Sequence, residues 1–106
     1  MKPKLVRDNV PELVAAQGKT MNLISMHPWD RLYWLEEKLL EEVNELMSAD
    51  SAREAEEEIG DILAALYAIA DQYKIDWLHL LDRAHDKTTE RGEFSKFLIW
   101  DGNEPS

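Results

Sequence analysis

The sequence predicts an all-α protein of antiparallel helices, and three observations support this fold class. Apolar residues recur every three to four positions over about 29–47, 52–73 and 77–90, the spacing of one helix face. The chain contains only 4 Gly and 4 Pro, and Gly92 follows the last of these segments. A length of 106 residues leaves room for one domain. We therefore expect a single all-α domain over 1–100 and a tail over 101–106.

The two ends of the chain are expected to be short and extended, with one small helix near the start. Residues 1–8 form a basic segment, and residues 94–100 (FSKFLIW) are apolar. Asn9 is a suitable cap for a helix over about 10–16, and Gly18 is a suitable stop.

Three long helices are expected between these ends. The first covers 29–47. The second covers 52–73 and begins with a capping-box signature, Ser51 followed three residues later by Glu54. The third begins after Asp76 as its cap. The residues expected to face the core are Leu32, Leu35, Leu39, Val43, Leu46, Ile59, Ile62, Leu63, Leu66, Ile69, Ala70, Trp77, Leu80, Leu81, Ala84 and Thr88.

The composition excludes several classes of protein. The absence of cysteine rules out disulfides, zinc–thiolate sites and thiol nucleophiles, and it fits a reducing compartment. No apolar run approaches the roughly 18 residues of a membrane span, and the first residues lack the apolar core of an export signal. We expect a cytoplasmic protein with no membrane partner. A net charge of −10 disfavours nucleic acid polymers, whose phosphates it would repel.

The acidic residues are concentrated in one window. Residues 36–61 hold 11 of the 22 acids and only two bases. Such a concentration does not exclude a phosphate substrate whose charge is bridged by a metal cation.

Four of these acids form two matched pairs. Glu42 and Glu45 are spaced i, i+3 on the first long helix, and Glu58 and Asp61 are spaced likewise on the second. At roughly 100° per residue, both pairs flank the apolar face of their helix. If the helices pack side by side, the four carboxylates converge at the rim of the groove. Oxygen-only ligands suit Mg²⁺ or Mn²⁺. The alternative is a solvated helix face.

Two further acids are harder to assign. Glu41 lies opposite the apolar face, so it is either solvated or in a supporting position. Glu36 lies roughly 40° from the apolar centre, which is unusual for a charge. It either meets a partner chain or a second metal, and its role stays open.

These acids spell a recognisable pattern, Glu41-Glu42-x-x-Glu45, then twelve residues, then Glu58-x-x-Asp61. The pattern resembles the EExxE…ExxD signature of the all-α nucleoside triphosphate pyrophosphohydrolases, a superfamily that holds the MazG proteins, the dimeric dUTPases and phosphoribosyl-ATP pyrophosphohydrolase. KLVRDNVPELV at 4–14 and K…RGEF at 87–94 resemble a small single-domain, MazG-like branch. The resemblance spans roughly residues 4–99.

The resemblance implies a fold, an activity and a site. Members hydrolyse the α–β phosphoanhydride of a nucleotide to a monophosphate and pyrophosphate, as helical dimers or dimers of dimers. Mg²⁺ is held by the signature acids, here Glu42, Glu45, Glu58 and Asp61. Water activated at the metal attacks phosphorus, and Glu41 is the expected helper.

Basic residues on the third helix are candidates to hold the phosphates. Arg83, Lys87 and Arg91 are spaced i, i+4, i+8 and so form one stripe. Lys87 and Arg91 also match the C-terminal motif, and we expect them to bind phosphate. The alternative is salt bridges to neighbouring acids.

Candidates also lie near the start of the chain. Lys4, Arg7 and Asp8 match the N-terminal motif and could close over the nucleotide, and Lys38 could neutralise Glu42 or reach a phosphate. We expect Arg7 and Lys38 to bind substrate. Base stacking or packing is expected of Trp29, Trp34 and Trp100.

Three functions remain in view. The first is a Mg²⁺-dependent nucleoside triphosphate pyrophosphohydrolase that clears unwanted nucleotides, acting as a homodimer or homotetramer. The second is phosphoribosyl-ATP hydrolysis. The third is a non-enzymatic acidic helical dimer that serves as a binding or regulatory module.

Overall fold

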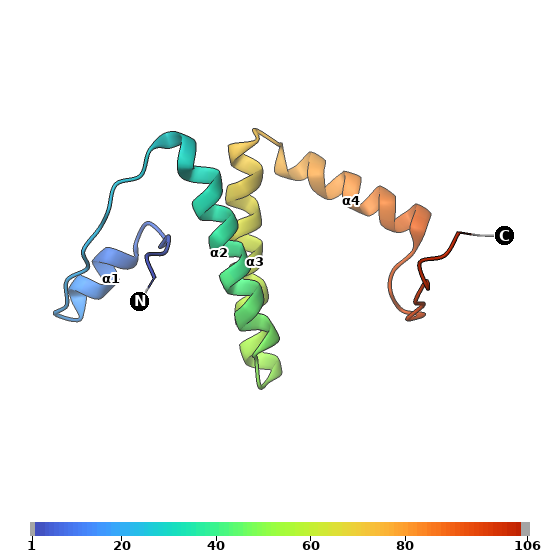
Figure 1. The fold of residues 1–106 in the computed structure, drawn as a ribbon, viewed down its shortest axis with the longest axis horizontal. Helices are drawn as coiled ribbons and strands as arrows, with labels where there is room; N and C mark the ends of the chain where they lie inside the picture. The colour runs from blue at the N-terminus through green and yellow to red at the C-terminus, as the bar shows by residue number, and fades with distance from the viewer. Residues whose placement is uncertain (1, 105–106) are drawn as a thin grey trace. The chain divides into compact units, whose positions relative to one another are not determined.

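The structure, a computed structural model, describes residues 2–104, and every regular element in that range is helical. The all-α prediction is confirmed at this level. The chain divides into two compact units that meet in sequence between Ile75 and Asp76 (Figure 1). The first unit holds α1 (Val10–Ala16), the 3₁₀ turn η1 (Pro28–Asp30), α2 (Arg31–Met47) and α3 (Ala52–Gln72), and the second holds α4 (Trp77–Arg91).

Helices α2 and α3 pack along each other and form the centre of the first unit (Figure 1). A short turn joins them, and the predicted cap at its end is present. The Glu54 N–H donates to Ser51 Oγ at 3.1 Å. The Glu54 carboxylate accepts from the Asp50 N–H at 2.9 Å, so it closes the turn one residue earlier than a standard capping box. This contact starts α3 at the predicted residue.

The core between α2 and α3 is thin. Among the described residues, only Glu42, Ala65 and Ala70 are buried, and each keeps 5–7% of its surface exposed. Most predicted core residues of α2 and α3 are half-buried at this contact: Leu32, Leu35, Leu39, Val43, Leu46, Ile62 and Ile69. Alanines at the centre of α3 let the two helices lie close together.

One part of the predicted core is wrong for the single chain. Ile59, Leu63 and Leu66 are 55%, 54% and 40% exposed. They lie roughly 100° to 160° around the helix from buried Ala65. The prediction merged two apolar faces of α3, because the whole circumference of this helix is rich in apolar residues. Only the face centred on Ala65 meets α2.

The small helix α1 occupies the predicted residues, although its ends differ in detail. Asn9 has helical backbone angles and no side-chain capping hydrogen bond, so the predicted side-chain cap is wrong. Leu13 N–H donates to the Asn9 carbonyl instead. Gly18 has a φ of +80°, a conformation in which a side chain is strained, and it ends the turn after α1 as expected.

The second unit follows the prediction through α4 and departs from it afterwards. Gly92 follows α4 with a φ of +82°. The Phe97 N–H donates to the Phe94 carbonyl at 3.2 Å, so residues 94–97 form a turn rather than the predicted extended segment.

Packing within the second unit is also lighter than predicted. Trp77 and Leu80 are half-buried, whereas Leu81, Ala84 and Thr88 are exposed. In the predicted tail, Trp100 Nε1 donates to the Asn103 carbonyl at 2.8 Å. Residues 105–106 of that tail lie outside the described range.

Removal of the α3 cap should measurably weaken the fold. We expect Ser51→Ala to lower the free energy of unfolding by about 1 kcal/mol, because the Glu54 N–H loses its acceptor. Urea denaturation followed by circular dichroism measures the change. Ser48→Ala is the control, since the Ser48 hydroxyl only donates back to the Asn44 carbonyl at the end of α2. Equal stability of the two variants would contradict the role of the cap.

Candidate metal centre

Three of the predicted acids converge between α2 and α3. Glu42 projects from α2, and Glu58 and Asp61 project from α3, with one carboxylate oxygen of each within 4.8 Å of the others. We call these three residues the acid cluster. The i, i+3 spacing of Glu58 and Asp61 places both on the face of α3 that meets α2. Convergence was predicted from that spacing, and for these three residues it is observed.

The acid cluster is partly withdrawn from water. Glu42 is only 5% exposed. Its Oε2 and the Oε2 of Glu58 are buried and have no hydrogen-bond partner. A buried carboxylate oxygen without a partner costs free energy, and that cost is removed when a cation binds it. The arrangement is therefore unfavourable as it stands and suited to a hard metal ion.

Lys38 supplies part of the missing positive charge. Its Nζ lies 3.0 Å from Glu42 Oε1, one helical turn away, and 3.6 Å from Glu41 Oε1. Burial by itself would lower the pKa of Lys38. The hydrogen bond to Glu42 and the charges of Glu41, Glu42 and Glu45 outweigh burial, so the pKa is raised and the ammonium stays charged.

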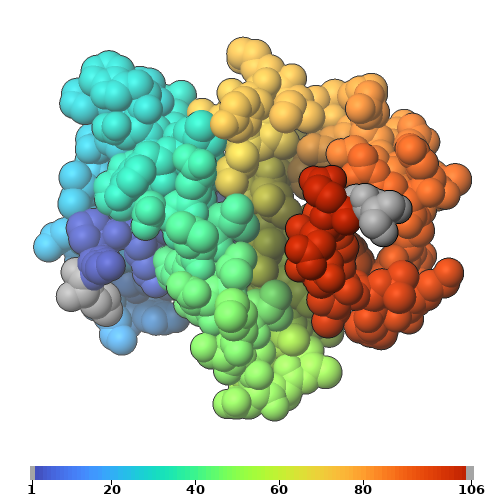
Figure 2. Space-filling model, turned by 45° about the vertical axis from the view of Figure 1, so that its right-hand side comes forward, coloured from blue at the N-terminus to red at the C-terminus, as the bar shows by residue number. Residues whose placement is uncertain are grey.

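The N-terminal segment, residues 2–8, supplies two further cations, Lys4 and Arg7. It lies against α2 (Figure 2). Arg7 Nη2 donates to Asp61 Oδ1 at 2.6 Å, across 54 positions of sequence. Lys4 Nζ donates to Glu41 Oε1 at 3.2 Å. Both pairs are largely exposed, so each adds little to stability and can be exchanged readily for another ion.

The two glutamates of the cluster have shifted pKa values of opposite sense. For Glu42, burial alone would raise the pKa, but hydrogen bonds with Lys38 and Glu58 lower it overall. For Glu58, hydrogen bonding with the Glu42 carboxyl, burial and the nearby charge of Glu45 raise the pKa to about 7. One carboxyl group thus ionises more readily than usual and its neighbour less readily, because full charge on both is unfavourable at this distance.

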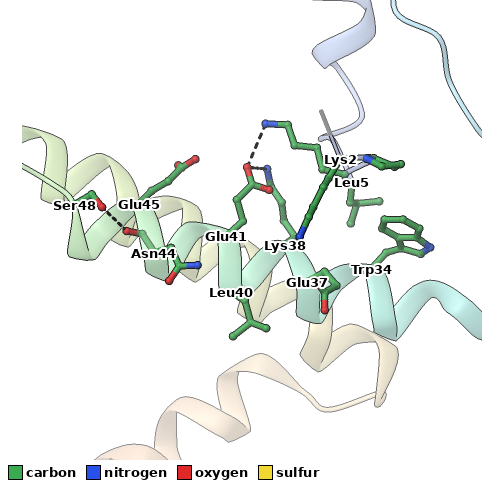
Figure 3. Close-up of a pocket in the computed structure, with 12 residues that line it drawn as sticks. Lys2, Leu5, Trp34, Glu37, Lys38, Leu40, Glu41, Asn44, Glu45 and Ser48 are labelled. Carbon is green, nitrogen blue, oxygen red and sulfur yellow. Dashed lines mark hydrogen bonds and ion pairs between the residues drawn. The ribbon is translucent and has the colours of Figure 1, made fainter.

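The remaining predicted acids lie around the three converging residues. Glu45 is exposed, and its hydrogen bond and charge help to raise the pKa of Glu58, while its hydrogen bond with Glu42 helps to lower the pKa of Glu42. Glu45 lies one turn beyond Glu41 on α2 (Figure 3). Glu41 faces the lysines Lys4 and Lys38 rather than the cluster. Glu36 is exposed and keeps an open role.

Glu41 and Glu45 line a different feature, a cavity of about 670 Å³ on the outer side of α2 (Figure 3). Lys2 and Leu5 of the N-terminal segment and Trp34 of α2 lie on its other side. Both charged and apolar side chains line this cavity.

The predicted phosphate ligands of the third helix lie in the second unit. Arg83, Lys87 and Arg91 are exposed along α4. Their role as phosphate ligands stays a prediction.

Two of the three tryptophans expected to stack or pack make a ring contact, although Trp29 stays 77% exposed. The Trp29 ring stacks on His27 with ring centroids 4.3 Å apart. Trp34 is half-buried and meets Tyr33 edge to face at 5.4 Å. Trp100 is 72% exposed and uses its N–H in the second unit.

Comparison with models of known protein families, with curated proteins and with solved structures gives no match to this chain. The resemblance to the pyrophosphohydrolases therefore rests on the motifs quoted above. Within residues 2–104, none of the helices is both long enough and apolar enough to span a membrane.

The raised pKa of Glu58 predicts a pH-dependent stability. The folded state binds a proton that the unfolded chain releases near its ordinary pKa, so this stabilisation is complete below that value and is lost as pH rises through about 7. We expect the melting temperature of the metal-free protein to fall between about pH 5 and about pH 8. Differential scanning calorimetry measures it.

Two variants isolate the contribution of Glu58. Glu58→Gln should flatten this part of the pH profile, since the amide does not titrate. Glu57→Gln, which removes the adjacent exposed carboxylate, should leave the profile unchanged. Parallel profiles for Glu58→Gln and the wild type would contradict the assignment.

Proposed function

We propose that the protein is a Mg²⁺-dependent nucleoside triphosphate pyrophosphohydrolase, which splits the α–β phosphoanhydride to a nucleoside monophosphate and pyrophosphate. The observation that carries this proposal is the acid cluster: three carboxylates from two helices within 4.8 Å, with buried oxygens that lack partners. Clearance of unwanted nucleotides is the role that fits such an activity. The motifs at both ends of the chain support the same conclusion.

The donor set supports the identity of the metal. All three groups are carboxylates, and Mg²⁺ and Mn²⁺ prefer hard oxygen ligands over nitrogen or sulfur. Glu42, Glu58 and Asp61 would hold the ion, and Glu45 is close enough to add negative charge. Mg²⁺ bound by few protein groups also takes substrate phosphate oxygens as ligands.

The cations around the cluster have two roles in this proposal. In the free protein, Arg7 and Lys38 neutralise Asp61 and Glu42. When a metal ion takes over those carboxylates, the same two side chains become free to bind phosphate oxygens. Arg7 can do so with two parallel hydrogen bonds, and Lys38 as a point charge. Lys87 and Arg91 are further phosphate ligands in this proposal.

Hydrolysis of the phosphoanhydride requires one bond to form, one to break and a proton to be removed from water. A water oxygen forms a bond to phosphorus, the bridging P–O bond breaks, and the proton from water must leave. A bound Mg²⁺ would neutralise phosphate charge and acidify a coordinated water. Glu41, paired with Lys4 and Lys38, positions Lys38 toward the site and keeps its ammonium charged.

The active assembly in this proposal is a homodimer with an antiparallel helical bundle at its centre. Ile59, Leu63, Leu66 and Tyr67 leave one side of α3 apolar and 40% or more exposed. A contiguous apolar face of this kind marks an interaction site in a water-soluble protein. A second copy of α3 buries it in an isologous contact, which also adds to the thin core of the single chain.

The function is tested by product analysis with Mg²⁺. The eight common ribo- and deoxyribonucleoside triphosphates and phosphoribosyl-ATP are each incubated with the protein. We expect a monophosphate and pyrophosphate from at least one of them. Release of orthophosphate instead would contradict the proposed bond cleavage. Exclusive turnover of phosphoribosyl-ATP would identify the second function given above.

Variants of the acid cluster connect that activity to the metal. Glu42→Gln and Asp61→Asn should lower kcat by at least about a hundredfold and abolish the rise of melting temperature on addition of Mg²⁺ or Mn²⁺. Glu57→Gln, on the exposed side of α3, should keep both properties. Circular dichroism checks that the helices persist. If the wild type gains no stability from either metal, the non-enzymatic acidic module is the better interpretation.

The dimer is tested by light scattering after size-exclusion chromatography. We expect twice the chain mass for the wild type and monomers for Leu63→Glu, because a carboxylate in the apolar interface is costly to desolvate. Ala52→Glu, at the exposed start of the same helix, should stay dimeric. A monomeric wild type would reject the assembly.

A further inference from the structure

A second cavity opens beside the acid cluster. It measures about 350 Å³ and lies between the N-terminal segment and the helices α2 and α3. Glu42 and Asp61 of the cluster line it, together with the cations Arg7 and Lys38. Apolar side chains also line it, among them Val6, Leu35, Ala64 and Ala68. We call this cavity the alanine pocket.

Small side chains on α3 leave the space of the alanine pocket open. Ala64 and Ala68 are spaced i, i+4 and therefore lie one above the other on α3, next to the buried Ala65. Together with Ala65, they contribute only methyl groups to the lining. Leu5 and Val6 of the N-terminal segment line the same cavity. Small apolar side chains of this kind leave room for an apolar, planar group.

A second observation indicates that this cavity holds a ligand. Glu42 is 5% exposed and lines the cavity, and its Oε2 has no hydrogen-bond partner. The cavity thus brings a buried carboxylate that can bind a cation together with apolar side chains that can contact an uncharged group. Neither Glu42 nor Asp61 lines the larger cavity on the outer side of α2.

We infer that the alanine pocket binds the nucleoside part of the substrate, with the base between Ala64 and Ala68 on one side and the N-terminal segment on the other. This inference rests on the proposed function. The triphosphate then extends toward the acid cluster, where Arg7 and Lys38 meet it. Ligand cavities in proteins measure roughly 300–1,000 Å³, so a volume of about 350 Å³ suits a group of the size of one nucleoside.

Filling the alanine pocket separates the binding of the nucleoside from the binding of the phosphates. Ala68→Leu should lower kcat/KM for every nucleoside triphosphate that the wild type hydrolyses by at least about tenfold, because the added carbons occupy the place of the base. The inhibition constant of inorganic tripolyphosphate should stay within about twofold of the wild type, since tripolyphosphate lacks a nucleoside. The Mg²⁺-dependent rise in melting temperature should also persist.

Two further variants serve as a control and as a substitute for Ala68→Leu. Ala55→Leu is the matched control, since Ala55 is also half-buried on α3 but lines neither of these cavities. It should retain kcat/KM. Ala64→Val adds less bulk to the same surface and should give a smaller loss; it replaces Ala68→Leu if circular dichroism shows that the leucine variant does not fold.

The outcomes distinguish the two levels of the argument. An unchanged kcat/KM in a folded Ala68→Leu or Ala64→Val variant would overturn the nucleoside site while leaving the hydrolase intact. An equal loss of tripolyphosphate affinity would also overturn it. A wild-type protein that hydrolyses no nucleotide would overturn the proposed function itself.

Discussion

The repulsion among three carboxylates between two helices is the constraint on which the rest of this structure depends. Glu42, Glu58 and Asp61 lie within 4.8 Å of one another, and Glu42 is almost fully buried. At such distances and with little water, full ionisation of all three is unfavourable. The raised pKa of Glu58 favours its uncharged form, which lowers the cost. Ion pairs of Lys38 with Glu42 Oε1 and of Arg7 with Asp61 Oδ1 lower it further.

The same constraint explains why the first residues of the chain lie where they do. The N-terminal segment has no regular structure before α1, and two charged contacts tie it to α2 and α3. These contacts leave a cavity that Leu5 and Val6 line together with Glu42 and Asp61 of the acid cluster. Electrostatic compensation of the acids thus also builds a wall of the alanine pocket, and in the proposed function the compensating cations turn to the phosphates once a metal is bound.

The thin core is the second consequence of this design. A pair of helices with alanines at its centre packs closely but buries little apolar area, and the favourable free energy of folding scales with that area. Close packing is what brings Glu42 within reach of Glu58 and Asp61. The apolar residues on the other side of α3 then remain available for a second copy, which would supply the area that the single chain lacks.

The sequence by itself determined the helices and the faces on which the acids lie. Helical periodicity and the cap at Ser51 gave the bounds of α3, and i, i+3 spacing put Glu58 and Asp61 together. The sequence did not separate the two apolar faces of α3. The spacing of apolar residues determines their angles around the axis of α3, but it does not determine which of these faces turns toward α2. The rotation of α3 about its axis decided which carboxylates converge within 4.8 Å, namely those of Glu42, Glu58 and Asp61, with Glu45 beside them.

Contacts between distant segments were likewise decided only in three dimensions. The bond from Arg7 to Asp61 spans 54 positions, and no local spacing rule reaches that far. Ala64 and Ala68 carried no signal in the sequence, since an alanine is equally common in a helix core, on its surface or beneath a ligand. Their meaning depends on the cavity that other segments enclose around them. The order of residues determines local geometry, whereas the shape of a site depends on which segments of the chain come into contact.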